Sequence, residues 1–233
     1  MYKRVLLKVS GEQLAGKYEF GVDPELAAFL AEEVKAAAKA CQIVMIVGGG
    51  NMVRGAEIAG HGIRRVTGDQ MGMLSGLINS MAVTDIFEAH GVATRCLSNI
   101  YAEQVAESYS FRLAEKHLEN NRVVLVAGGT GRAYVTHDTA AVMFGLELGC
   151  QAVLKATKFD GVYDKDPAQF PEACKIDAMT FSQAVADKAI KVMDKAALGL
   201  AMEHGLRLIV FDALKPGNIA RLAAGEPVGT KIS

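Results

Sequence analysis

The chain has 233 residues, of which 51% are hydrophobic and 22% are charged, and its formal net charge is −1. This composition is typical of a globular protein with a large core and excludes a disordered chain. The near-zero charge excludes an electrostatic footprint for nucleic acid or an anionic membrane, and no apolar run is long enough to span a bilayer. The four cysteines share no C-x-x-C spacing, so we expect free thiols and a reducing cytoplasm.

Strands and helices alternate along the chain. The predicted strands are Val5–Val9, Ile43–Val47, Val92–Leu97, Val123–Ala127, Ala152–Lys155 and Leu206–Phe211. The predicted helices are Pro24 to about Ala40, Asp69 to about Met81, Tyr101–Leu118, Ala140–Leu148 with Asp138 or Thr139 as its cap, Thr180–Ala186, Met193–Glu203 and Pro216–Ala224. Strand–helix–strand units favour a parallel sheet. We therefore predict an α/β fold, a three-layer αβα sandwich with a central, mainly parallel twisted sheet, as a single domain over residues 1–233.

Three of the predicted strands end in glycine-rich turns: Ser10-Gly11, Gly48-Gly49-Gly50 and Gly128-Gly129-Thr130-Gly131. Residues without a Cβ let a ligand approach the backbone, whose N–H groups then face it. The carboxyl ends of strands in an open α/β sheet are where such ligands bind. A tight structural turn explains a single turn of this kind about as well, but three such turns favour bound phosphate.

Two common phosphate-binding motifs are excluded. Gly11–Lys17 fits G-x-x-x-x-G-K, but Tyr18 follows where a P-loop needs Ser or Thr, and no helix pattern comes next. The glycine turns do not complete G-x-G-x-x-G either, because Val53 and Tyr134 stand where the last glycine belongs.

Cations and aspartates accompany the glycine turns. Lys8 and Lys155 stand inside predicted strands, where a buried ammonium is costly unless it meets an anion. Together with Arg54 they favour bound phosphates and stabilisation of a transferred phosphoryl group. A phosphate monoester acceptor has a second pKa of about 6, so it needs no general base at neutral pH. The charged segment 156–167 is either a loop over a nucleotide or a solvated hairpin, and Asp69 near a helix start is also explained by the helix dipole alone.

The chain carries five motifs in order: Lys8–Gly11, Gly48–Asn51 with Arg54, Gly68–Met73, Gly129–Gly131 and Lys155–Tyr163. Together they resemble the bacterial uridylate kinase family, a branch of the amino acid kinase superfamily, almost from Met1 to Ile232. Gly68–Met73 and Lys191–Asp194 point to the uridylate branch specifically. The resemblance implies Mg²⁺-assisted phosphorylation of UMP to UDP by ATP in pyrimidine nucleotide biosynthesis, by direct in-line transfer without a general base. It also implies a cytoplasmic homohexamer that GTP activates and UTP inhibits.

The resemblance implies a role for each matching position. Lys8 and Lys155 would stabilise the transition state, while Asp138 and Asp194 would orient these lysines or hold Mg²⁺, which the ATP phosphates mainly bind. The ATP side would comprise Lys8, Val9, Ser10, Gly11, Gly50, Arg54, Thr157, Lys158, Tyr163 and Asp166. The UMP side would comprise Gly49, Asp69, Thr130, Gly131, Arg132, Ala133, Tyr134, Val135, Thr136 and His137. The effector loop would comprise Gly16, Lys17, Tyr18, Glu19, Phe20 and Gly21. The part before about residue 150 would serve mainly UMP, and the part after it mainly ATP.

Two alternatives remain. Another kinase of the superfamily, acting on acetylglutamate, aspartate or carbamate, would need an acceptor pocket different from Gly68–Met73. A non-catalytic nucleotide- or oxyanion-binding protein would not need both lysines. The chain also departs from the family pattern, since Arg132–Val135 and His137 stand where the family has an Asn-Pro pair, aromatics and a second Thr. We further expect Gly49→Val to abolish activity without unfolding the protein.

Overall fold

The computed structural model describes residues 1–59, 62–186 and 192–233. Its centre is a nine-stranded sheet in the order β4-β3-β5-β2-β1-β6-β10-β11-β9, in which the β10–β11 pair is antiparallel and the other pairs are parallel. The strands are β1 (Arg4–Val9), β2 (Gln42–Val47), β3 (Thr94–Ser98), β4 (Glu107–Ser108), β5 (Val123–Ala127), β6 (Ala152–Thr157), β9 (Ala178–Met179), β10 (Arg207–Asp212) and β11 (Thr230–Ile232). A separate antiparallel pair joins β7 (Val162–Tyr163) to β8 (Lys175–Ile176).

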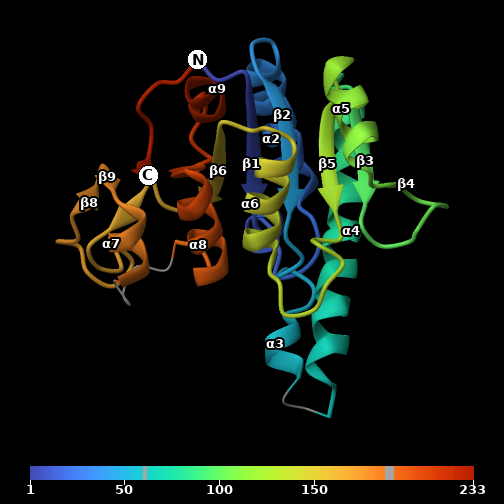
Figure 1. Ribbon diagram of the computed structural model, residues 1–233, viewed down its shortest axis with the longest axis horizontal. Coiled ribbons are helices and arrows are strands. Elements are labelled where there is room, and N and C mark those ends of the chain that lie inside the picture. The colour runs from blue at the N-terminus through green and yellow to red at the C-terminus, as the bar shows by residue number, and fades with distance from the viewer. Residues whose placement is uncertain (60–61, 187–191) are drawn as a thin grey trace.

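Helices cover both faces of the sheet (Figure 1). One face packs against α2 (Pro24–Ala38), α4 (Arg65–Ala89) and α9 (Asn218–Ala223). The other packs against α5 (Phe111–Glu119), α6 (His137–Glu147), α7 (Phe181–Ala186) and α8 (Lys195–His204). Two short helices, α1 (Gly11–Leu14) and α3 (Gly55–Ile58), follow β1 and β2. The predicted three-layer αβα fold with a mainly parallel sheet is confirmed.

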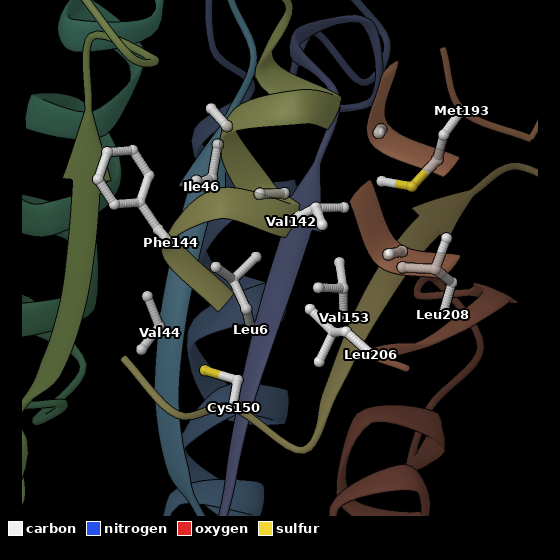
Figure 2. Packing of buried hydrophobic residues seen from close by; sticks show 14 of the residues in the cluster. Leu6, Val44, Ile46, Val142, Phe144, Cys150, Val153, Met193, Leu206 and Leu208 are labelled. Atoms are coloured by element: carbon white, nitrogen blue, oxygen red, sulfur yellow. The ribbon is translucent and has the colours of Figure 1, made fainter. Parts of the chain in front are cut away.

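The central strands are apolar on both sides, which is why they form the middle layer. In β1, Leu6 belongs to the core under α6, whereas Val5 and Leu7 belong to the core on the α2 face. Figure 2 shows the first of these cores, where Val142 and Phe144 of α6 lie over the strands. Both faces of the parallel strands therefore exclude water, as strands of this kind require.

The short elements differ from the prediction. The stretch from Tyr101 is not helical until Phe111, because Ser110 caps α5 by accepting the N–H of Leu113 at 3.3 Å. Thr136, rather than Asp138 or Thr139, caps α6. The short helix α1 was not predicted. It lies within Gly11–Lys17, where Ser10 and Gln13 form a capping box around its start, and no helix follows Lys17 before α2. These ends depend on single hydrogen bonds, which periodicity does not specify.

The cysteines and the length of the helices were both subjects of the predictions from composition. Cys41, Cys96 and Cys150 are buried free thiols, and Cys174 is an exposed one. Every helix in the described part of the chain falls short of the length or the apolarity that crossing a bilayer takes.

Candidate active site

Lys8 and Lys155 share one carboxylate. The register pairs Lys8 of β1 with Lys155 of β6, so both side chains leave the same face of the sheet. That face lies under α6, which carries Asp138 in its first turn. The Nζ atom of Lys8 is 2.7 Å from Asp138 Oδ1, and that of Lys155 is 2.7 Å from Oδ2. The structure therefore brings three of the four predicted catalytic residues into contact.

Burial and charge act in opposite directions on this group. Burial raises the pKa of Asp138, but the charges of Lys8 and Lys155 outweigh it and hold that pKa below its ordinary value of 3.8. Burial lowers the pKa of Lys155 from its ordinary value of 10.5, although the attraction of Asp138 opposes this. Two ammonium groups and one carboxylate leave an excess positive charge near the carboxyl ends of the central strands β1 and β6. A phosphoryl group in transfer needs such a charge, and the low local dielectric strengthens it.

Asp194 is hydrogen-bonded to the start of α6, and its charge also favours the charged form of Lys155 by raising the pKa of that lysine. Its Oδ1 accepts the N–H of Ala197 at 2.9 Å, which makes Asp194 the cap of α8. The same carboxylate accepts the hydroxyl of Thr139 at 2.9 Å, and that of Thr136 as well. Among the described residues it forms no ion pair with Lys8 or Lys155. Lys191, in the motif that points to the uridylate branch, lies outside the described residues.

The glycine turn after β2 packs tightly against α4. A Cβ at Gly49 would lie 2.4 Å from the carbonyl oxygen of Gly72 and 2.8 Å from the amide nitrogen of Gly76. These are backbone atoms of a helix, so they have no room to move aside. Whether Gly49→Val leaves the fold intact, as the sequence analysis expects, stays a prediction. These contacts add that the new side chain would push against α4 and lower the stability of the protein.

Two buried amides hold this turn in place, one from Asn51 in the Gly48–Asn51 motif and one from Asn79, which was not among the predicted site residues. Asn79 of α4 donates from its Nδ2 to Gly48 O and to Asn51 Oδ1, both at 2.7 Å. Asn51 in turn donates to Asn79 Oδ1 at 3.1 Å and to Gly21 O at 2.5 Å. Asn79 is fully buried. Asn79 shares the buried face of α4 with Ser75, Gly76 and Ser80, so no local pattern in the sequence set it apart, although a buried amide needs partners.

A cavity of about 380 Å³ opens beside the turn. Its lining includes residues predicted for the UMP side (Gly49, Asp69, Val135, Thr136 and His137) and for the ATP side (Gly50 and Arg54). A larger cavity of about 690 Å³ lies between α9, β8 and β11, and none of the predicted site residues lines it. The smaller cavity is the better candidate site, since it adjoins the two lysines through His137 and Asp138.

Asp69 organises the rim of this cavity. Its Oδ2 accepts the N–H of Tyr134 at 2.8 Å, and its Oδ1 accepts Nε of Arg65 at 2.8 Å. Tyr134 has a left-handed backbone with φ of 66° and is 70% exposed, with the Arg65 guanidinium 5.4 Å from the centre of its ring. Asp69 lies in the second turn of α4, so the helix dipole alone does not explain it.

His137 is the first residue of α6 and faces the cavity as a neutral imidazole. Burial, reinforced by the charge of Lys8, lowers its pKa to about 4. Its Nε2 has no hydrogen-bond partner among the described residues. The ring lies directly against Gly76 of α4, where a Cβ would be 2.6 Å from Nε2. The imidazole therefore keeps a free donor or acceptor beside the lysines.

The remaining predicted ATP residues lie after β6. Thr157 ends β6 and donates to Phe159 O at 2.7 Å, while the hydroxyl of Tyr163 donates to Asp160 at 2.6 Å. Asp166 accepts the N–H of Ala168 at 3.0 Å. These are local contacts within the loop and the β7–β8 hairpin. In the described chain, Thr157 is linked to the lysines only through its place two residues after Lys155.

The predicted effector loop joins the glycine turn through its last residue. Gly21 O accepts the Asn51 amide, and the N–H of Lys17 donates to Asp23 at 3.2 Å. Tyr18 and Phe20 are exposed. The loop is thus tied at both ends and displays its aromatic side chains.

The comparisons with known proteins agree with this geometry. The model of the amino acid kinase family matches residues 3–212. A solved structure of UMP kinase from Bacillus anthracis is 33% identical, with a TM-score of 0.93, covering 100% of this chain and 96% of that one. UMP kinase from Ureaplasma parvum is 30% identical, with a TM-score of 0.91 and coverage of 100% and 99%.

A uridylate kinase from Archaeoglobus fulgidus has the same fold at 24% identity, with a TM-score of 0.76 and coverage of 98% and 99%. The resemblance predicted from the motifs is confirmed by the family match and by the two bacterial structures. The chain belongs to the amino acid kinase family.

Proposed function

We propose that this kinase transfers the γ-phosphoryl group of ATP to UMP and releases UDP and ADP. The observation that carries the proposal is the pair Lys8 and Lys155 on one carboxylate, beside a cavity that Asp69 and His137 line. The two bacterial UMP kinases of similar structure support the choice of acceptor. Mere binding of a nucleotide would not need two ammonium groups held at one point.

The mechanism follows from charge and position. Lys8 and Lys155 stabilise the negative charge that spreads over the transferred phosphoryl oxygens, and Asp138 holds both ammonium groups in place. The acceptor oxygen belongs to a phosphate that is already an anion near pH 7, because its second pKa is about 6. No general base is required, and His137, whose pKa is lowered to about 4, would be a weak one. Asp194 fixes the start of α6 through Thr136 and Thr139.

Mg²⁺ fits this site as a companion of the ATP phosphates. Both oxygens of Asp138 face lysines, and those of Asp194 accept hydroxyl and amide hydrogens, so the protein offers few free carboxylate oxygens here. Phosphate oxygens are the ligands that Mg²⁺ prefers in kinases. When bound, the ion would neutralise charge on the β- and γ-phosphates. Arg54, with the backbone of Ser10, Gly11 and Gly50, would hold the phosphates themselves.

The finer proposals concern the substrate sides, regulation and assembly. The N-terminal part would hold UMP, with Asp69 on the ribose hydroxyls, and the part after about residue 150 would hold ATP, with Tyr163 in the adenosine site. The Gly16–Gly21 loop would respond to GTP, UTP would inhibit, and the chain would assemble as a homohexamer in the cytoplasm. The hydrogen bond from Asn51 to Gly21 offers a route from that loop to the glycine turn.

A test of the acceptor is a coupled assay of ADP release with ATP and Mg²⁺. The acceptors are UMP, CMP, acetylglutamate and aspartate, with an acceptor-free control for ATP hydrolysis. We expect UMP to give the highest kcat/KM. If UMP turns over no faster than the others, the proposed function is wrong, and turnover of a carboxylate acceptor would favour a different kinase of the family.

A further inference from the structure

Glu12 holds two groups that the proposed function gives to the donor phosphates. It is the second residue of α1, and its carboxylate rests on Gly50, where a Cβ would lie 2.2 Å from Oε1. The same oxygen is 3.1 Å from Nη2 of Arg54. Gly50 and Arg54 are both proposed contacts of ATP. An acidic side chain of the protein therefore lies against Gly50, on the side where a Cβ would project, and pairs with the guanidinium that a phosphate would use.

A carboxylate and a phosphate compete for the same binding groups because both are anions that accept hydrogen bonds. Guanidinium groups and backbone N–H groups bind either anion with charge-assisted hydrogen bonds. Two anions cannot occupy these groups together, since like charges a few ångströms apart repel each other. The lack of a side chain at Gly50 is what lets the Glu12 carboxylate come so close. The contact is thus built into the shape of the turn.

The contact is also weak enough to open. The Arg54 side chain is 52% exposed and that of Glu12 is 38% exposed, so water screens the pair. Exposed pairs of this kind contribute little stability, and a Glu side chain reaches solvent by rotation about its own bonds. Release of the carboxylate would leave the glycine turn unchanged, because Asn51 and Asn79 hold that turn independently.

We propose that Glu12 competes with the donor phosphates for Gly50 and Arg54. Its carboxylate leaves these two residues when a triphosphate binds, and this competition lowers the affinity of the protein for the donor. The inference rests on the proposed function, since that function places the donor phosphates at these two residues. It gives Glu12 a task distinct from transition-state stabilisation. The affinity for ATP is then set partly by the protein's own carboxylate.

Glu57 offers a matched control. It pairs with the same guanidinium at 3.1 Å, through Nη1 rather than Nη2. The three atoms nearest to a Cβ built at Gly50 all belong to Glu12. Glu57→Gln therefore removes one negative charge beside Arg54, as Glu12→Gln does, but it leaves the Glu12 carboxylate against Gly50. A comparison of Glu12→Gln with Glu57→Gln separates displacement from a general change in charge.

The experiment is calorimetric titration of the wild type, Glu12→Gln and Glu57→Gln with a non-hydrolysable ATP analogue and with inorganic tripolyphosphate. Each titration is run in Mg²⁺ and in EDTA, and thermal melting verifies that each variant is folded. We expect Glu12→Gln to bind both probes about threefold to tenfold more tightly, with or without Mg²⁺. Glu57→Gln should change the Kd less than twofold. The gain should shrink at high ionic strength, because salt screens the repulsion.

Equal or weaker binding by folded Glu12→Gln would overturn the inference, and so would an equal gain in Glu57→Gln. Weaker binding in Mg²⁺ alone would instead make Glu12 a ligand of the metal. Glu12→Ala repeats the test should the glutamine keep the contact with Arg54. If the wild type binds neither the ATP analogue nor tripolyphosphate, the proposed function fails, which is a result separate from the comparison between variants.

Discussion

Lys8 and Lys155 stand opposite each other on adjacent parallel strands, and each lies 2.7 Å from the same carboxylate. The register of β1 and β6 fixes their spacing, and the first turn of α6 brings Asp138 between them. Burying an ammonium group is costly without an anion, and Asp138 offsets that cost for both lysines. In the proposed function, this arrangement places two cations where a phosphate would bind, while one carboxylate stabilises them.

Asp138→Asn should destabilise the protein at neutral pH. The substitution leaves two buried ammonium groups without their carboxylate, and removing one member of a buried ion pair costs about 3 kcal/mol or more. Urea unfolding at pH 7 measures the loss. The exposed Asp85 of α4 provides a control, since Asp85→Asn should change the free energy of unfolding by no more than about 0.5 kcal/mol.

A comparison of the wild type with Asp138→Asn at several pH values tests the lowered pKa of Asp138. Because the folded pKa lies below 3.8, the unfolded chain binds more protons between the two values, and stability falls as the pH drops through that window. The contribution of Asp138 is complete above pH 3.8 and is lost below its folded pKa. The stability gap between the wild type and Asp138→Asn should therefore narrow from pH 5 toward pH 2. A gap that does not depend on pH would contradict the assignment.

Gly49→Ala should cost stability through packing. Even one methyl group would meet the backbone of α4 at 2.4 Å, and overpacking of this kind costs about 1–3 kcal/mol. Gly199 of α8 is the matched control, because a Cβ there meets nothing within 4 Å. Gly199→Ala should stabilise by up to about 1 kcal/mol, since alanine is the better helix former. Chemical denaturation of both variants measures the change in the free energy of unfolding. No change in Gly49→Ala would show that α4 moves aside at little cost and would contradict this prediction.

His137 should make the protein less stable as the pH falls from 6.5 toward 4. Its folded pKa of about 4 lies below the ordinary 6.5, so the unfolded chain takes up the proton first. Between pH 7 and pH 5 this predicts a loss of about 2 kcal/mol that His137→Thr should lack. Unfolding in urea at the two pH values measures the difference. Equal losses of unfolding free energy in the wild type and in His137→Thr would show that the imidazole is solvated, and they would contradict the lowered pKa.

The sequence predicted the central strands because their signals are local and strong. The buried runs ahead of Ser10-Gly11, Gly48 and Gly128 are almost entirely apolar and lead into glycine-containing turns, which favours strands of a parallel sheet. The ends of α5 and α6 were predicted less well. They depend on which of several neighbouring hydroxyl groups, such as those of Thr136 and Thr139, points at a backbone N–H.

The candidate site could also be predicted only in part from the sequence. Residue types and positions singled out Lys8 and Lys155, because a charge inside an apolar strand is conspicuous in the sequence. The pattern alone made Asp138 a candidate helix cap, and its role beside the lysines came from the family resemblance. The packing role of Gly49 and the amide pair of Asn51 and Asn79 depend on how closely β2 approaches α4. That distance joins segments remote in sequence, and no local pattern encodes it.

The central claim is that Lys155 stabilises the transition state of phosphoryl transfer to UMP. Lys155→Met should remain folded, because Asp138 keeps its ion pair with Lys8, and it should bind ATP with little change. The decisive measurement is the rate of UDP formation from ATP and UMP, followed by phosphorus NMR, with the exposed Lys39→Met as control.

We predict UDP and ADP in equal amounts from the wild type and from Lys39→Met, and a rate at least a hundredfold lower, roughly 2.7 kcal/mol, from Lys155→Met. A rate in Lys155→Met within about tenfold of the wild type, roughly 1.4 kcal/mol, would contradict the account, as would release of ADP and free phosphate without UDP.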